Sequence, residues 1–301
     1  MPVVSAIITT FNRERFLGAA IESVLSQTYR DFELLVLDNS SSDGTAALVG
    51  RWRDPRIRYV RHAPLRIAAA RNLGVREARG EFVAFLDDDD EWLPRKLERQ
   101  VGVFRAAPAG VGLVYAGFTQ IDERGVAFGT HRPALRGRVL TALLGQRDAF
   151  TGSASNPMMR ATALQALGGF NEALTTSEDW ELYLRLAERF EVEYVPEVLV
   201  YIRTHRESRL GDRIDDARNV EEIVLGRYGS RMSARLRSLY LRKIGGKLCR
   251  TGALREGRAR IRQAISIDPL NPLAYAQYGL SFLGRRTYGR VHSVYRRLRP
   301  G

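Results

Sequence analysis

Four consecutive aspartates, Asp87 to Asp90, are the residues of this 301-residue sequence with the clearest chemical potential. They directly follow an apolar run, Phe82 to Leu86, that is typical of a buried strand. Adjacent carboxylates repel one another, and a divalent cation placed among them relieves the repulsion. Carboxylate oxygens suit Mg²⁺ or Mn²⁺, especially where phosphate oxygens complete the coordination shell. The alternative is a solvated acidic turn before a helix at Pro94, and the position at a strand end favours the metal site.

Two further strand ends carry polar residues. The first apolar run, Val3 to Thr10, is followed by Phe11 and Asn12, and the second, Phe32 to Leu37, stops at Asp38. The Asp38 carboxylate could accept hydrogen bonds from a base or ribose, or it could cap the next helix. No G-x-G-x-x-G follows the first run and no G-x-x-x-x-G-K occurs, so the sequence does not support dinucleotide or P-loop binding.

A third acidic signal, Glu178-Asp179-Trp180, opens a strong helical pattern that runs to Arg189. A carboxylate here could remove a proton from an attacking hydroxyl, or simply complement the helix dipole. The indole of Trp180 could present a flat apolar face to a sugar or belong to the core. His205 is a potential metal ligand, since neutral imidazole binds metals well, and otherwise a packing or surface residue.

Strand-like and helix-like patterns alternate through the first hundred residues. Ile57 to Val60 is typical of a strand, and Ile67 to Ala78 of a helix. Further along, Asp122 to Gly125 predicts a hairpin turn, and two separate strands are expected near 192–195 and 198–202. The order of elements predicts an α/β fold with a mostly parallel sheet covered by helices on both faces.

The pattern changes beyond Arg213, where helical periodicity dominates. We therefore predict a catalytic domain over residues 1–213 and a helical extension over 214–301. Within the extension, Ala253 to Tyr275 resembles one tetratricopeptide repeat. A solenoid needs about three repeats, so an amphipathic helical tail packed on the catalytic domain is the favoured interpretation.

The formal charge of +13 comes almost entirely from arginine. Such an excess attracts nucleic acid, anionic lipid or a phosphorylated substrate, although a biased genome composition would produce it too. No apolar run approaches the roughly 18 residues of a membrane-spanning helix, and the N-terminus lacks the features of a secretory signal. With Cys249 as the single cysteine, a disulfide within the chain is excluded, and a cytoplasmic location is expected.

Taken in series, four segments resemble glycosyltransferase family 2. These segments are Val4–Asn12, Leu37–Thr45, Ala70–Gly74 and Phe85–Asp90. The resemblance covers residues 3 to 210 in order and spacing. It implies the GT-A fold and inverting transfer of a sugar from a nucleoside-diphosphate donor, usually UDP-linked, to a hydroxyl of a glycan or lipid-linked acceptor. It also implies Mn²⁺ or Mg²⁺ as the cofactor and a role in polysaccharide or cell-envelope synthesis.

The resemblance assigns roles to individual residues. The implied donor-binding residues are Thr10, Phe11, Asn12, Asp38, Arg71, Asp87 and Asp88. In the D-x-D motif the first Asp contacts the ribose and the last holds the metal, and here the motif fits as Asp87/Asp89 or as Asp88/Asp90. The first register is favoured because Asp87 directly follows the strand. Asn39 departs from the pattern, since many members carry Asp there.

Three remaining roles concern the metal, the base and the acceptor. Some members of the family have a histidine here near the metal or the diphosphate, which makes His205 a candidate second metal ligand with Asp89. It makes Asp179 the catalytic base, with Glu178 and Trp180 beside the acceptor. Two rivals stay open from the residues alone: a nucleotidyltransferase, and a non-enzymatic protein that binds nucleic acid or membranes through its charge. For the favoured enzyme we expect no nucleic-acid partner, and peripheral contact of the basic C-terminus with the inner face of a membrane.

Overall fold

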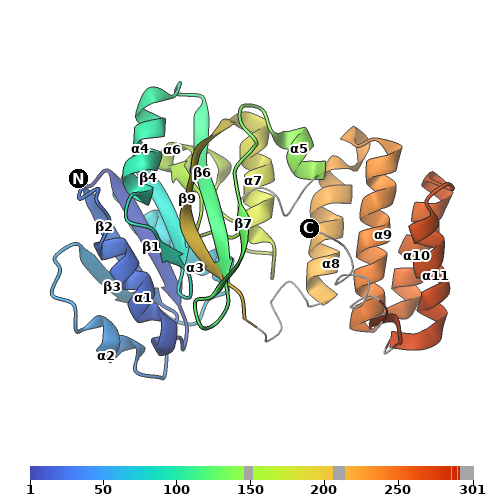
Figure 1. The fold of residues 1–301 in the computed structure, drawn as a ribbon, viewed down its shortest axis with the longest axis horizontal. Coiled ribbons are helices and arrows are strands. Elements are labelled where there is room, and N and C mark those ends of the chain that lie inside the picture. Colours follow the sequence, from blue (N-terminus) through green and yellow to red (C-terminus); the bar gives the residue numbers. More distant parts are fainter. Residues whose placement is uncertain (146–151, 206–213, 286, 290, 292–301) are drawn as a thin grey trace. The chain divides into compact units, whose positions relative to one another are not determined.

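The computed structural model describes residues 1–145, 152–205, 214–285, 287–289 and 291 of the chain (Figure 1). The chain divides into two compact units, one made of Met1–Ala173 with Glu178–Arg206, the other of Leu174–Ser177 with Glu207–Gly301. The boundary predicted from the sequence, after residue 213, lies outside the described residues. It falls close to the division between the two units.

The first unit is built on one mixed sheet. Its strands, in chain order, are β1 (Val4–Thr10), β2 (Phe32–Asp38), β3 (Ile57–Arg61), β4 (Phe82–Asp87), β5 (Glu91–Trp92), β6 (Val111–Ile121), β7 (Ala127–His131), β8 (Met158–Arg160) and β9 (Glu191–Arg203). The spatial order is β3-β2-β1-β4-β8-β6-β9-β5, with β7 paired to β6. Strands β1 to β4 run parallel, and β8 is antiparallel to both of its neighbours. The predicted α/β class is confirmed.

Two local expectations have different outcomes. The hairpin predicted around residues 122–125 is confirmed, because β6 and β7 pair antiparallel across that turn. The two strands expected near 192–195 and 198–202 are wrong as separate elements, since β9 runs through both. Irregular pairing with β6 around Ala116 and Gly117 absorbs the break that the sequence pattern shows.

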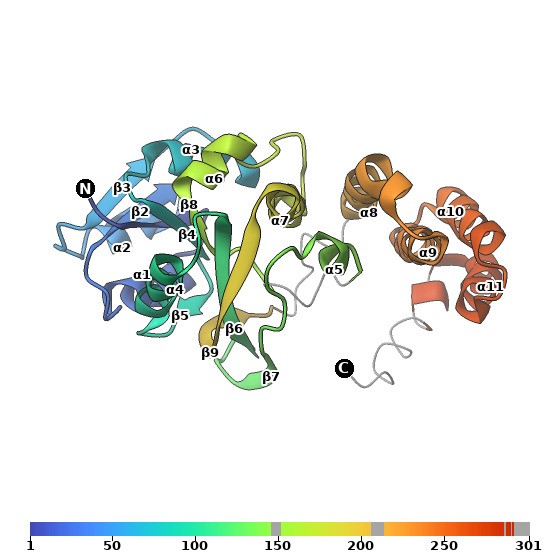
Figure 2. The same cartoon turned by 90° about the horizontal axis from the view of Figure 1, so that it is seen from above.

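Helices cover both faces of this sheet. They are α1 (Glu14–Leu25), α2 (Thr45–Val49), α3 (Ile67–Glu77), α4 (Lys96–Ala106), α5 (Leu140–Gly145), α6 (Ala161–Leu167) and α7 (Glu178–Arg189). Figure 2 shows α1 and α4 on one face and α3, α6 and α7 on the other. The alternation of strand side chains explains the layers: Ile8 of β1 packs with Leu17 of α1, while Ile7 points to the opposite face, toward Gly74 of α3.

Asn72 of α3 fixes the connection that leads into α7. Its Nδ2 donates to Phe170 O at 2.9 Å, and its Oδ1 accepts from Phe170 N at 2.8 Å. Gly169 makes this approach feasible: its φ is +74°, and a Cβ there would lie 2.4 Å from Asn72 Oδ1. The clamp therefore sets where the acidic first turn of α7 begins relative to the sheet.

A completely buried lysine lies in the first turn of α4. Lys96 Nζ donates to Gln100 Oε1 at 2.8 Å and lies 4.0 Å from the centre of the Trp92 ring. Burial holds the pKa of Lys96 well below its ordinary value. The unfolded chain therefore binds one proton more than the folded protein in the window between the lowered pKa and the ordinary value near 10.4.

Between the lowered pKa of Lys96 and its ordinary value, the unfolded state binds one proton more than the folded state. In that pH range Lys96 therefore makes the free energy of unfolding rise with pH, by at most about 1.4 kcal/mol per pH unit. We expect the Lys96→Met variant to lack this slope. Urea unfolding of both proteins between about pH 7 and pH 10 measures it, since every other titrating group cancels in the difference. Parallel pH profiles would show that Lys96 keeps its proton in the folded protein.

The second unit is helical, which confirms the predicted helical extension. Its helices are α8 (Ile214–Val220), α9 (Ala234–Thr251), α10 (Leu254–Ile267) and α11 (Pro272–Leu280), with a π-helical turn (Glu221–Gly226) and 3₁₀ turns (Gly229–Arg231 and Ser281–Leu283). Glycines let α9 and α10 approach closely, since a Cβ on Gly257 would lie 2.6 Å from Gly245 O. The tetratricopeptide-like segment spans α10 and the start of α11. In the part of the chain that the structure describes, no helix is long and apolar enough to cross a membrane.

Candidate active site

The carboxyl ends of three adjacent parallel strands form the edge of the sheet where the predicted residues lie. In the register of the sheet, Thr10 of β1 pairs with Asp38 of β2, and Thr9 pairs with Asp87 of β4. The end of β1 is therefore flanked on both sides by an aspartate. Ligands of open α/β sheets bind beyond this edge.

Backbone strain is concentrated around the same edge. Among the described residues, the non-glycine residues with positive φ are Asn12 (52°), Ser40 (64°) and Ser177 (64°). They follow β1, follow β2 and precede α7, respectively. Asn12 also ties the first two loops together, since its N–H donates to Ser41 Oγ at 3.0 Å and its Oδ1 accepts from Ser42 N at 2.8 Å. Such strain, worth about 1–3 kcal/mol per residue, typically collects at functional sites.

Asp38 is enclosed by hydrogen bonds and has no exposed surface. Ser41 N donates to its Oδ1 at 2.8 Å, and the Tyr59 hydroxyl donates to its Oδ2. Burial alone would raise the pKa of Asp38, but these donors and the charge of Arg61 hold it below its usual value. Burial and the neighbouring Asp38 raise the pKa of Tyr59 to about 12. Contact of Asp38 with a base stays a prediction, whereas Phe11, 54% exposed, is open to a planar ligand.

Arg71 of α3 joins the acidic turn after β4 to the start of α7. It is buried, and its Nη2 donates to Asp87 Oδ1 at 2.8 Å while its Nη1 donates to Glu178 Oε1 at 2.7 Å. Burial raises the pKa values of Asp87 and Glu178, and the Arg71 guanidinium opposes that shift in both. Arg71 therefore has both terminal nitrogens engaged by protein carboxylates, and direct contact with the diphosphate stays a prediction.

Asp179 belongs to the same electrostatic cluster. Its charge contributes to raising the pKa of Asp87, of Glu178 and of the buried Tyr183, after the larger effect of burial in each case. Its own Oδ1 accepts a hydrogen bond from Trp180 N at 2.7 Å. The structure thus brings together carboxylates from two segments that lie about ninety residues apart in sequence.

The four aspartates form one hydrogen-bonded turn, in which Asp90 N donates to Asp87 O at 3.1 Å. The Asp90 side chain points back into the protein and is buried. Ser155 Oγ donates to its Oδ2 at 2.6 Å, and Arg203 N donates to its Oδ1 at 2.7 Å. These bonds make Asp90 an anchor for the turn. The geometry accordingly favours the Asp87/Asp89 register over Asp88/Asp90.

Asp89 lies beside His205 in the structure, and a metal-binding role for the two stays a prediction. Asp89 Oδ2 and His205 Nε2 are 2.7 Å apart, and Arg13 Nη1 is 3.9 Å from the same oxygen. His205 also packs edge-on against Phe16, with ring centres 5.2 Å apart. Asp88, on the same turn, has its pKa raised to about 7, mainly by burial.

The donor set at Asp89 and His205 fits a divalent cation whose shell a substrate completes. Among the described residues, no group of three or more His, Cys, Asp or Glu side chains converges as a metal site. Mg²⁺ in particular is usually held by one or two carboxylates together with substrate phosphates. A carboxylate and an imidazole side by side are compatible with that arrangement and with Mn²⁺.

The acceptor-side residues are placed differently from expectation. Trp180 is only 4% exposed, so the prediction that its ring offers a face to an acceptor sugar does not match the structure. Its position in the helical pattern falls on the buried side of α7, which is where large apolar residues belong. Glu178 is 7% exposed and paired with Arg71, so it acts as an anchor for the start of α7.

Removal of the Arg71 guanidinium should be strongly destabilising. An Arg71→Met substitution leaves the buried carboxylate of Glu178 and the partly exposed carboxylate of Asp87 without their cation, which costs about 3–5 kcal/mol. Arg71→Lys should recover part of the loss, because an ammonium keeps the charge but not the fork that reaches both carboxylates. Urea unfolding of the three proteins measures this. A loss below about 1 kcal/mol in the methionine variant would contradict the assigned bridge.

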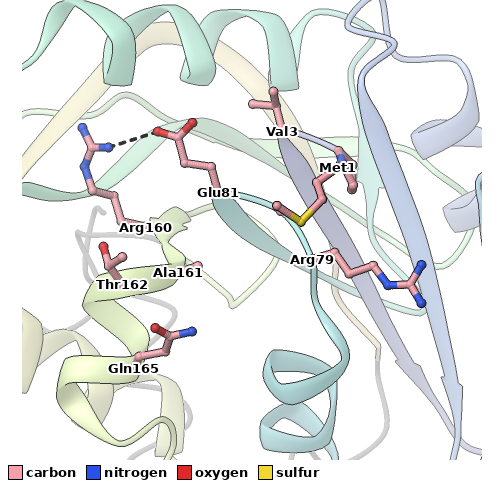
Figure 3. Close-up of a pocket in the computed structure, with 10 residues that line it drawn as sticks. Met1, Val3, Arg79, Glu81, Arg160, Ala161, Thr162 and Gln165 are labelled. Atoms are coloured by element: carbon pink, nitrogen blue, oxygen red, sulfur yellow. Dashed lines mark hydrogen bonds and ion pairs between the residues drawn. The ribbon is translucent and has the colours of Figure 1, made fainter.

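A separate pocket of about 490 Å³ opens at the opposite edge of the sheet, at the amino ends of β1 and β4 (Figure 3). Its polar walls are committed to the fold: Arg160 pairs with Glu81 and donates to Val111 O at 2.9 Å. Because ligands of open α/β sheets bind at the carboxyl edge, this pocket is not the expected donor site.

The fold and the acidic carboxyl edge together define an α/β protein with the layout of a GT-A transferase. The chain belongs to glycosyltransferase family 2, since the family model described as glycosyl transferase family 2 matches residues 5–168. An Escherichia coli relative named UDP-Glc:alpha-D-GlcNAc-diphosphoundecaprenol beta-1,3-glucosyltransferase WfgD is 38% identical over 125 residues, covering 41% of this chain and 49% of that protein. An uncharacterized glycosyltransferase of Rickettsia felis is 28% identical over 212 residues, covering 69% of this chain. The chain spans only 35% of that relative's length.

Solved structures establish the GT-A fold. S. aureus TarS 1–349 in complex with UDP-GlcNAc superposes with a TM-score of 0.70 at 16% identity, covering 99% of this chain and 92% of that one. The mannosyltransferase PcManGT from Pyrobaculum calidifontis, in complex with GDP-Man and Mn²⁺, gives a TM-score of 0.61 at 20% identity, covering 97% and 84%. At these identities the likeness concerns the fold alone.

Proposed function

We propose that this protein transfers a sugar, with inversion, from a nucleoside-diphosphate donor to a hydroxyl group of a lipid-linked or glycan acceptor, with a divalent cation as cofactor. The observation that carries the proposal is the bridge from Asp87 through Arg71 to Glu178. The bridge joins the aspartate turn, which would face the donor, to the start of the helix that carries Asp179. Neither rival from the sequence has a comparable observation in its favour, and the family assignment speaks against both.

The proposed roles follow from placement. Phe11 and the loops tied together by Asn12 would receive the nucleoside, and Asp87 the ribose. Asp89 and His205 would hold the cation, which supplies positive charge to the departing diphosphate. Asp179 would take the proton of the acceptor hydroxyl as the new bond forms at the anomeric carbon. The bond from that carbon to the diphosphate breaks on the opposite face, and a nucleoside diphosphate leaves.

The relatives supply the choice of donor and acceptor class. WfgD is named for UDP-glucose and a diphosphoundecaprenol-linked acceptor, and TarS 1–349 was solved with UDP-GlcNAc. We extend a UDP-linked donor and a lipid-linked acceptor to this chain as part of the proposal. The buried free thiol of Cys249 is compatible with a cytoplasmic location, where the proposal places the reaction.

Thermal stabilisation by a panel of nucleotide sugars tests the proposal. A donor that binds the folded protein raises its melting temperature by mass action, so a UDP-sugar with Mn²⁺ should raise it more than the same sugar with EDTA. The donor so found should then release its nucleoside diphosphate when an acceptor is added. If no nucleotide sugar stabilises the protein in either condition, the proposed donor class is refuted.

A further inference from the structure

The positive charge of the protein belongs to one of its two units. Residues 1–206 contain 26 Arg and Lys against 26 Asp and Glu, so they are neutral. Residues 207–301 contain 21 Arg and Lys against 8 Asp and Glu, which leaves the whole excess of +13 there. Arginine is abundant in both units, since 25 of the 26 basic residues of residues 1–206 are arginine, but only there does an equal number of acidic residues balance the charge. The excess is therefore a property of the helical unit.

Large apolar side chains are exposed on this same unit, around α11. Tyr275 is 50% exposed, Phe282 57%, Leu283 61%, and Leu270, just before the helix, 91%. Adjacent exposed apolar side chains mark surfaces that bind something apolar, whereas single ones are ordinary. Phe282 and Leu283 are adjacent in the 3₁₀ turn that ends this segment, so both are presented from one rigid turn.

Arginines flank that turn. The Arg258 guanidinium lies 4.3 Å from the centre of the Phe282 ring, and its Nη2 donates to Ser281 O at 3.1 Å. On the other side, Arg285 follows within two residues of Leu283, and its Nε donates to Arg250 O at 3.2 Å. The result is an apolar tip between fixed cationic groups, which we call the Phe282–Leu283 tip.

We propose that the helical unit binds the surface of an anionic phospholipid bilayer through the Phe282–Leu283 tip. The two apolar side chains would enter the boundary between headgroups and acyl chains, while the flanking arginines and the net charge of the unit meet the anionic headgroups. Nucleic acid would also attract the charge, but an exposed aliphatic side chain such as Leu283 has no base to stack on. The combination of charge and aliphatic exposure favours lipid.

Sedimentation of the full chain with vesicles tests the proposal. Binding is expected to phosphatidylcholine vesicles that contain about 30% phosphatidylglycerol, and it should fall at least about tenfold with phosphatidylcholine alone or at about 0.5 M salt. The double variant Phe282→Ser/Leu283→Ser should bind the anionic vesicles about tenfold more weakly. Because both side chains are exposed, its urea midpoint should match that of the parent protein.

The control is Val126→Ser, which removes an equally exposed apolar side chain (60%) from the neutral unit and should leave vesicle binding unchanged. The proposal is overturned if the parent protein fails to sediment with anionic vesicles at low salt. It is also overturned if the double variant binds anionic vesicles as tightly as the Val126→Ser control does. A third contrary outcome is that duplex DNA competes with vesicles for the protein, while the double substitution changes neither the affinity for DNA nor the affinity for vesicles. These outcomes do not depend on sugar transfer, so they separate this proposal from the proposed function.

Discussion

Asp179→Asn is expected to lower the rate of sugar transfer by about a thousandfold or more while donor binding persists. The substitution keeps the shape of the side chain and an oxygen that can accept from Trp180 N, but an amide cannot take the proton of the acceptor hydroxyl. Because the proposed role of Asp179 concerns the acceptor, the dissociation constant of the donor should change little. Release of nucleoside diphosphate measures the rate, and calorimetry measures donor binding.

A matched substitution guards against a general effect of lost charge. Glu22→Gln, on the exposed side of α1, removes the same charge from the same unit and should leave the rate unchanged. If Asp179→Asn turns over donor as fast as this control does, Asp179 is not the base. If it loses donor binding as well, the side chain serves the donor rather than the acceptor.

Asp89→Ala is expected to abolish the dependence of donor affinity on Mn²⁺. In the proposed site the cation would link Asp89 and His205 to the diphosphate, so its removal by EDTA should weaken donor binding of the parent protein by about a hundredfold. In the variant, calorimetric titrations of the donor with Mn²⁺ and with EDTA should give the same weak affinity. The side chain is partly exposed, and its loss should change the folding stability little.

Asp90→Asn is the counterpart that separates the two registers of the aspartate run. The buried carboxylate of Asp90 accepts hydrogen bonds from Ser153, Ser155 and Arg203. The asparagine amide has only one oxygen to accept them, because its other terminal atom is an NH₂ group. The substitution should lower the free energy of unfolding by about 1–3 kcal/mol and preserve the Mn²⁺ dependence. The reverse outcome, with metal dependence lost at Asp90 and kept at Asp89, would assign the ion to the other register.

Sequence patterns predicted the scaffold of the site because the scaffold is local. Apolar runs ending in Thr10, in Asp38 and before Asp87 mark strands β1, β2 and β4, and parallel pairing then places their ends on one edge. The start of α7 at Glu178 and its end at Arg189 follow from helical periodicity and coincide with the structure. The same periodicity places Trp180 among the buried residues of α7, which favours a core position for its ring over contact with an acceptor.

The contacts that organise the site could not be predicted, because they join segments far apart in sequence. Arg71 reaches Glu178 across 107 positions, and Arg203 meets Asp90 across 113. The sequence did not indicate that Arg203 bonds several residues of the aspartate turn. Its Nε donates to Asp89 O at 2.9 Å, and its Nη2 pairs with Glu91. The role of Ser155 is not predictable for the same reason, since the sequence around a loop serine does not indicate that its hydroxyl donates to the Asp90 carboxylate.

The position of the cation is the most direct test of the account. Crystals of the protein grown with UDP and Mn²⁺ should give an anomalous difference peak when data are collected at the manganese absorption edge. We expect this peak about 2.0–2.2 Å from an Asp89 carboxylate oxygen, with diphosphate oxygens in the same coordination shell. Asp87 should lie toward the ribose, and Asp90 should remain bonded to Ser155. A bound UDP whose diphosphate lies away from Asp89, or a manganese peak elsewhere on the protein, would contradict the account.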